Sequence, residues 1–171
     1  MDRILIAYFS RSGENYFGGF VKTTEKGNTE ICVNLILEFL EADTYKIEME
    51  DPYSDNYQEC TAQAKQDLVL KRRPKLTSLP ENIGHYDTVI LGYPNYWGTL
   101  PMAVAAFLEA FDFSGKKILP FCTHEGGDMG RSEAMIKKLC PTAEVAKGKA
   151  ILGSNAANAM ADLEEWIQET V

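Results

Sequence analysis

Five short apolar runs recur along the chain, and a longer stretch of helical periodicity separates each run from the next. They cover residues 3–9, 44–49, 87–93, 116–122 and 143–152. The first, third and fourth are nearly continuous in apolar residues, which is typical of parallel strands covered on both faces. In the second run Tyr45, Ile47 and Met49 alternate with charged residues. It therefore predicts a strand with one exposed face, nearer an edge of the sheet.

The intervals between the runs show the spacing of apolar residues that is expected of amphipathic helices. We expect helices over about 28–42, 55–70, 101–111, 131–140 and 155–171. Pro101 suits the first position of one helix, and Pro141 ends the helix that precedes it. The alternation of strands and helices predicts an α/β fold in one domain, 1–171, with a parallel sheet and helices on both faces.

In an open parallel sheet of this kind, ligands bind beyond the carboxyl ends of the strands. The loops after Phe9, Tyr93 and Cys122 are therefore where we expect a ligand site. No internal repeat, low-complexity tract or second domain is evident in the sequence.

Composition narrows the choice of partners. The net charge of −8 and the isoelectric point of about 4.8 disfavour nucleic acid, which needs a basic surface, and suit attraction to a basic protein partner. The four cysteines show neither CxxC spacing nor a zinc pattern with the two histidines, so no metal site is expected. We find no membrane span and no export signal, and expect a cytoplasmic protein with reduced thiols.

The first of the three loops has small polar residues at both ends of a long segment. Ser10 and Ser12 follow the strand, and Asn28 and Thr29 begin the helix. Hydroxyl groups and free backbone N–H groups at a helix N-terminus form an anion site. Neither a nucleoside-triphosphate loop nor a GxGxxG fingerprint is present. Alternatively, Asn28 or Thr29 only caps the helix.

The second loop, Gly92 to Met102, carries Pro94, Tyr96, Trp97 and Gly98. Large aromatic residues at a strand end are expected to be covered by a flat partner, and glycine lets the backbone approach that partner closely. Alternatively, Trp97 packs on the adjacent helix.

The third loop, Cys122 to Ser132, is rich in glycine. Thr123, Glu125, Gly126 and Gly127 offer exposed main chain able to hydrogen-bond a planar ring. His124 is open to three interpretations: a proton donor, a ligand contact or a surface residue. Together the three loops describe a mononucleotide with a flat ring, and flavin mononucleotide (FMN) fits best.

Over nearly its whole length the sequence resembles the flavodoxin family. The motifs are "ILIAYFSRSG" with "GNTE", "LGYPNYWGTLP" and "PFCTHEGGDMGRS". The resemblance implies a doubly wound five-stranded parallel sheet of order 2-1-3-4-5 that binds FMN. It also implies three groups of cofactor-binding residues. Those near the phosphate are Ser10, Arg11, Ser12, Asn28 and Thr29. Those in the first loop that contacts the ring are Pro94, Asn95, Tyr96, Trp97 and Gly98, and those in the second are Thr123, His124, Glu125, Gly126 and Gly127. No catalytic residue is implied. Because these proteins hold the phosphate without a countercharge, Arg11 is expected to point outward or toward the ribityl chain or ring.

The chain departs from the family in one place. The segment Gly13–Lys26 interrupts a phosphate loop that is normally continuous, and it contains Tyr16, Phe17 and Phe20 around Gly18-Gly19. We hypothesise that it folds as a small flap or hairpin over the flavin or shapes partner choice, while "SRSG" and "GNTE" meet in space. The alternative is a surface excursion without a role.

The function expected from this resemblance is FMN-dependent electron transfer with a basic redox partner, a reductase or an oxidase. The alternative is an FMN-dependent NAD(P)H:quinone or nitro-compound oxidoreductase, which needs space for a second flat substrate. A third class, the flavin-free phosphate-receiver domain, needs clustered aspartates after the first strand, where this chain has Ser10-Arg11-Ser12.

Overall fold

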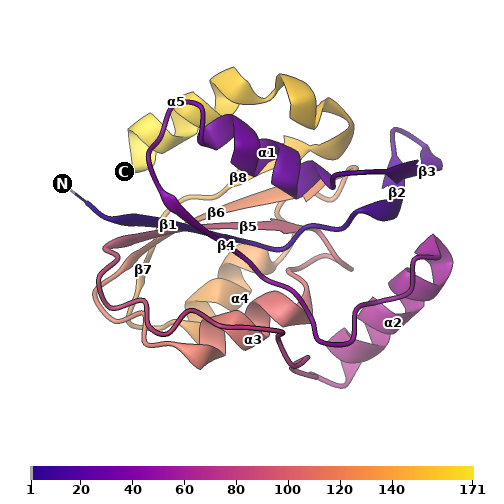
Figure 1. The fold of residues 1–171 in the computed structure, drawn as a ribbon, viewed down its shortest axis with the longest axis horizontal. Helices are drawn as coiled ribbons and strands as arrows, with labels where there is room; N and C mark the ends of the chain where they lie inside the picture. The colour runs from indigo at the N-terminus through magenta and orange to yellow at the C-terminus, as the bar shows by residue number, and fades with distance from the viewer. Residues whose placement is uncertain (1) are drawn as a thin grey trace.

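A parallel sheet forms the centre of the computed structural model, which describes residues 2–171 (Figure 1). The strands follow the order β4-β1-β5-β6-β7, with β8 also paired to β6. Their bounds are β1 (Ile4–Tyr8), β4 (Asp43–Lys46), β5 (Thr88–Pro94), β6 (Lys117–His124), β7 (Glu144–Val145) and β8 (Lys149–Leu152). Since β5 pairs along one edge of β6, β7 and β8 both lie on the other edge. They are two pieces of one fifth strand, so the predicted order 2-1-3-4-5 is confirmed.

The degree of burial follows the apolar pattern of the strands. Every residue of β1 is buried, and Ile90 of β5 and Leu119 of β6 are completely inaccessible. β4 lies at the edge, where Ile47 just after it is buried and Glu48 is exposed. The prediction of an edge strand with one exposed face is therefore confirmed.

Helices cover both faces of the sheet. α1 (Asn28–Ile36), the 3-10 helix η1 (Gly153–Asn158) and α5 (Met160–Thr170) lie on one face, and α3 (Met102–Ala110) and α4 (Ser132–Leu139) lie on the other (Figure 1). Two clusters of buried apolar side chains result, one on each face. α2 (Tyr57–Val69) lies apart from these layers, below the hairpin at the right of the view.

Three predicted elements are shorter or more broken than the sequence pattern indicates. The first helix ends at Ile36, because the next turn tightens to i→i+3 bonds from the N–H groups of Glu38 and Phe39. The fifth strand breaks before Gly148, whose N–H leaves the sheet and donates to Glu133 Oε2 at 3.0 Å. The last helix is divided at Ala159 into η1 and α5.

The insertion folds as an antiparallel hairpin, as hypothesised. β2 (Gly13–Phe17) pairs with β3 (Phe20–Thr24). The turn between them consists of Gly18 and Gly19, with φ angles of +60° and +98°. Two successive residues with positive φ give the turn that matches the twist of a hairpin, and glycine adopts that conformation without steric cost.

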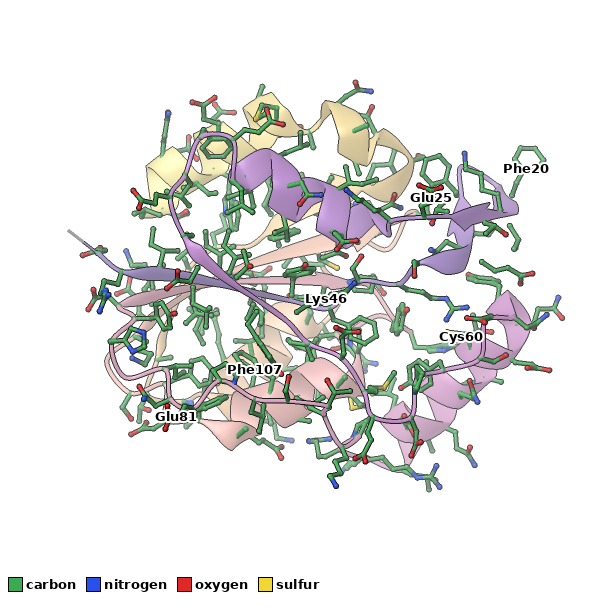
Figure 2. The ribbon with its side chains drawn as sticks, in the orientation of Figure 1. Phe20, Glu25, Lys46, Cys60, Glu81 and Phe107 are labelled. Atoms are coloured by element: carbon green, nitrogen blue, oxygen red, sulfur yellow. The ribbon has the colours of Figure 1, made fainter. Side chains whose placement is uncertain are left out.

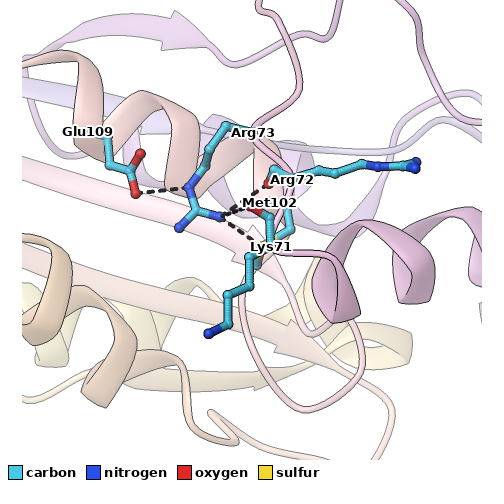
Figure 3. Close-up of polar contacts among 5 residues, drawn as sticks. All are labelled: Lys71, Arg72, Arg73, Met102 and Glu109. Carbon is cyan, nitrogen blue, oxygen red and sulfur yellow. Dashed lines mark hydrogen bonds and ion pairs between the residues drawn. The ribbon is translucent and has the colours of Figure 1, made fainter.

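The basic segment 71–75, directly after α2, connects that helix to α3. Arg73 donates from Nε to Glu109 Oε1 at 2.9 Å, and its Nη1 donates to the carbonyls of Lys71 and Arg72, both at 3.2 Å (Figure 3). Arg72 also pairs with Asp67 at 3.6 Å. These contacts hold the far end of α2, while its first turn approaches the hairpin.

Within residues 2–171, no helix is long and apolar enough to cross a membrane. Cys32, Cys60, Cys122 and Cys140 are all buried free thiols.

Candidate functional site

A cavity of about 480 Å³ opens at the carboxyl ends of β1, β5 and β6, between the hairpin and α2. It brings together residues from all three loops singled out in the sequence. Those that line it are Ser10, Arg11, Asn28, Thr29, Pro94, Asn95, Tyr96, Trp97, Thr123, His124 and Glu125.

Four predicted residues lie beside the cavity instead of lining it. Ser12 borders a smaller neighbouring cavity of about 210 Å³. The Gly98 carbonyl accepts from Arg131 N at 2.7 Å, which joins the second loop to the start of α4. Gly126 and Gly127 are exposed on the outer side of the third loop.

The two halves of the interrupted phosphate loop meet at Gly27. A Cβ atom at this position would collide with Ser10 Oγ and with the backbone of Arg11, so only glycine allows the approach. Gly27 is the N-cap residue of α1, and Ser10 Oγ accepts from Glu30 N at 3.1 Å. The hydroxyl group of Ser10, 20 residues before Glu30, therefore caps the helix in place of Asn28 or Thr29.

The start of α1 presents free backbone donors to the cavity. Among the described residues, neither Asn28 N nor Thr29 N has a hydrogen-bond acceptor. The Thr29 hydroxyl is bonded to the Thr123 hydroxyl at 2.9 Å, and both side chains are buried. Unpaired N–H groups at a helix N-terminus attract an anion, so this end of the cavity suits a phosphate group.

The aromatic loop contains a strained turn. Trp97 has φ of +57° and Gly98 has φ of +81°, while Tyr96 and Thr99 exchange backbone hydrogen bonds on either side. A positive φ is costly for a bulky side chain and is found where the surroundings impose it, often at functional sites. The turn projects the Trp97 ring to the cavity wall with 48% of its surface exposed.

Asn95 fixes that turn to the third loop. Its Oδ1 accepts from Gly98 N at 2.9 Å, and its Nδ2 donates to the Asp128 carbonyl at 3.0 Å. Its own N–H donates to the Thr123 carbonyl at 2.8 Å. The two loops predicted to enclose a ring are therefore held as one unit.

His124 orders the third loop from within. Its Nδ1 accepts from Gly126 N at 2.9 Å, and its Nε2 lies 3.3 Å from Asp128 Oδ1. Because Nδ1 is an acceptor here, the proton is on Nε2. Both ring nitrogens are engaged within the loop, so His124 orders the loop that forms this wall of the cavity, a role that the sequence analysis did not consider.

Arg11 joins the hairpin to the segment before α2. Its Nε donates to the Glu14 carbonyl at 3.0 Å, and its Nη2 donates to the Asp55 carbonyl at 3.0 Å. Glu14 strengthens the same junction, because its Oε2 accepts from Tyr57 N at 2.8 Å, at the first residue of α2. Arg11 thus lines the cavity while its guanidinium group is held by backbone carbonyls.

One wall of the cavity, formed by α2 and the hairpin, was not predicted from the sequence. This wall consists of Asn15, Tyr16, Tyr57, Cys60, Thr61 and Ala64. The four α2 residues have i, i+3, i+4, i+7 spacing, the pattern of one helix face, which could have been recognised in the sequence. Tyr16 was noted as part of the insertion, and its ring stacks on that of Tyr57 with centroids 6.3 Å apart.

Two buried polar atoms at the cavity have no hydrogen-bond partner among the described residues, the Tyr96 hydroxyl and Glu125 Oε1. Burial, with a smaller contribution from the nearby Cys60 thiol, raises the pKa of Tyr96, so its phenol stays protonated and able to donate. Burial also raises the pKa of the Cys60 thiol, which makes it a poor nucleophile. The unpaired Tyr96 hydroxyl is therefore available to donate a hydrogen bond to a bound ligand.

Comparisons with solved structures show proteins of the same architecture. A protein from Bacteroides eggerthii, provisionally assigned as a flavoprotein, is 26% identical over 99% of this chain and 98% of its own, with a TM-score of 0.77. A flavoprotein from Lactobacillus acidophilus in complex with FMN is 11% identical over 98% and 99% of the chains, with a TM-score of 0.67. A Fusobacterium nucleatum flavodoxin bound to FMN is 14% identical over 99% and 96%, with a TM-score of 0.52.

Comparison with curated proteins gives no match. The sequence model of the flavodoxin family, in contrast, matches residues 3–170. That match spans β1 to α5 and includes the hairpin and every loop of the cavity. The chain therefore belongs to the flavodoxin family.

Proposed function

We propose that this protein binds FMN in the cavity and transfers electrons between protein partners. The main observation behind the proposal is that the cavity combines two environments. Free N–H groups of α1 line one part, and the rings of Tyr96 and Trp97 line another. A phosphate ester joined to a flat ring fits that arrangement. Structural relatives from L. acidophilus and F. nucleatum contain FMN, which supports the assignment.

The residues present suit each part of such a ligand. The N–H groups of Asn28 and Thr29, with the Ser10 hydroxyl, would hold the phosphate, as the cradle closed by Gly27 suggests. The rings of Tyr96 and Trp97 would contact the flat ring system, and the unpaired Tyr96 hydroxyl can donate to it. When bound, FMN supplies the redox chemistry, and the protein contributes orientation and electrostatics.

The charge of the protein fits electron transfer with a basic partner. A net charge of −8 attracts a positively charged reductase or oxidase and accelerates its encounter with the protein. The same negative charge opposes the addition of an electron at the cavity and would lower the reduction potential of a bound flavin.

A second candidate, an FMN-dependent NAD(P)H:quinone or nitro-compound oxidoreductase, is favoured by one observation. The cavity extends beyond the three flavin loops onto Tyr16, Tyr57, Cys60 and Ala64, an aromatic and apolar wall. That wall would suit a flat second substrate. An electron carrier has less need of it, since its partner collects electrons at the surface.

Two measurements test these proposals in order. FMN added to the purified protein should remain bound through gel filtration, and loss of all flavin would refute both candidates. The bound protein is then titrated with NADPH in the absence of oxygen and of any reductase. No loss of the flavin's visible absorbance supports the carrier, whereas direct bleaching supports the oxidoreductase.

A further inference from the structure

The carboxylate of Glu125 lies at the end of the cavity where a phosphate would bind. Glu125 directly follows β6, and its Oε2 accepts from Gly18 N in the hairpin turn at 3.4 Å. A Cβ atom added to Gly153 would lie 2.9 Å from Glu125 Oε1 and would also collide with Asn28 Nδ2. The side chains of Glu125 and Asn28, the first residue of α1, therefore both lie next to Gly153.

At this position the carboxylate oxygens of Glu125 accept few hydrogen bonds. Its Oε1 is buried and lacks a partner among residues 2–171, and the contact of Oε2 with Gly18 is long for a hydrogen bond. A carboxylate is stabilised near a helix N-terminus by the helix dipole. The negative charge of Glu125 thus offsets part of the positive potential at the start of α1, which would otherwise attract a bound phosphate.

We propose that Glu125 determines how strongly the cavity prefers a phosphorylated flavin over the same flavin without phosphate. Its negative charge opposes a phosphate dianion at the start of α1, because like charges brought together in a partly buried site repel. The ring and ribityl chain of riboflavin carry no such charge. Glu125 therefore weakens the binding of FMN and leaves that of riboflavin nearly unchanged. The proposal rests on the proposed FMN site and adds a selectivity residue to it.

The test compares two ligands that differ only in the phosphate. The apo-protein, residues 1–171, is titrated with FMN and with riboflavin, and each Kd is measured from the quenching of flavin fluorescence. Glu125→Gln removes the charge and keeps the shape, and Glu125→Ala removes the charge and the bulk. The matched control is Glu81→Gln, which changes the net charge equally at an exposed position on the opposite side of the molecule from the hairpin (Figure 2).

Both Glu125 variants are expected to raise the ratio of riboflavin Kd to FMN Kd by about fivefold or more, through tighter binding of FMN. The control should change that ratio by less than about twofold, as expected of a distant exposed charge. An unchanged ratio in Glu125→Gln would overturn the proposal. So would weaker binding of both flavins, which would make Glu125 a hydrogen-bond acceptor for the ribityl chain, or a gain in Glu125→Ala alone, which would indicate an effect of bulk. If the unsubstituted protein bound neither flavin, the proposed function itself would fail.

Discussion

Trp97 donates its indole N–H to the backbone carbonyl of Thr61 at 2.8 Å, which ties the loop after β5 to the helix α2. Lys65 Nζ lies 4.8 Å from the centre of the same ring, in cation–π geometry. The alternative that Trp97 packs on a neighbouring helix and the expectation that it faces a ligand are therefore compatible. Its edge is anchored on α2 while its ring remains at the cavity.

Two substitutions separate these roles of Trp97. Trp97→Ala removes both the ring and the anchor, and should weaken FMN binding by at least about tenfold, since an aromatic contact and its buried area are lost. Trp97→Phe keeps an aromatic face but not the N–H donor, and should cost less than Trp97→Ala. Fluorescence titration with FMN measures both. Equal affinity of Trp97→Ala and the unsubstituted protein would contradict a ring contact.

Gly27→Ala should disrupt the meeting of the two loop halves. The new methyl group would collide with Ser10 Oγ and the Arg11 backbone, so the free energy of unfolding should fall by about 2 kcal/mol, with a larger relative loss of FMN affinity. Urea denaturation and flavin titration report the two effects. Gly84→Ala is the control, because its Cβ would have only an ordinary contact, 3.6 Å from Asn82 Oδ1. Unchanged FMN binding in Gly27→Ala would mean that the phosphate is held elsewhere.

The hairpin offers a matched pair of aromatic residues. Tyr16 lines the cavity and stacks on Tyr57, whereas Phe20 is 75% exposed at the hairpin tip and lies outside the cavity (Figure 2). Under the hypothesis that the hairpin folds over the flavin, Tyr16→Ala should weaken flavin binding by roughly fivefold, about the value of one aromatic contact, and Phe20→Ala should leave it unchanged. Isothermal titration calorimetry measures both affinities. If the two variants behaved alike, the hairpin would be a surface excursion without a role at the site.

Cys32 provides a prediction about alkaline pH. It is fully buried, and burial raises the pKa of its thiol to about 12, whereas in the unfolded chain the thiol has a pKa of about 8.5. The stabilisation is therefore complete below pH of about 8.5 and is lost as pH rises toward the folded-state value. Above about pH 9, the free energy of unfolding should fall by about 1.4 kcal/mol per pH unit more steeply in the unsubstituted protein than in Cys32→Ala.

The measurement for Cys32 is urea denaturation under reducing conditions at several pH values. Cys32→Ala will be less stable near neutral pH because it leaves a small cavity, so the comparison concerns the slopes and not the absolute values. If the free energy of unfolding fell equally steeply with pH in both proteins, ionisation of the Cys32 thiol would not destabilise the folded state.

Much of the architecture could be read from local patterns. Continuous apolar runs such as Ile4–Tyr8 predict buried parallel strands because both faces of the sheet need covering. Their carboxyl ends then locate the ligand loops, since strands of one parallel sheet end at a common edge. In this way local patterns predicted the parallel sheet and the loops around one cavity, whereas the resemblance to flavodoxins supplied the strand order and added Arg11 and Asn95 to the eleven predicted residues that line it.

The sequence pattern failed where a residue's role depends on a distant partner. The spacing of Tyr57, Cys60 and Ala64 could have marked one face of α2, but it does not show that this face turns toward the cavity. Contacts of Glu14 and Arg11 across the junction with the hairpin decide that. Strand periodicity likewise did not show the break before Gly148, because that glycine leaves the sheet to bond Glu133.

By itself, then, the sequence determined the order of strands and helices, the loops at the strand ends and the hairpin in the first loop, because these depend on neighbours in the chain. Tertiary structure alone decided that Ser10 caps α1 from outside it, that Trp97 is anchored on α2, and that the Glu125 carboxylate reaches Gly18, 107 residues away. Those contacts arise only when the packed sheet brings distant loops to one edge. Local propensity carries no information about them.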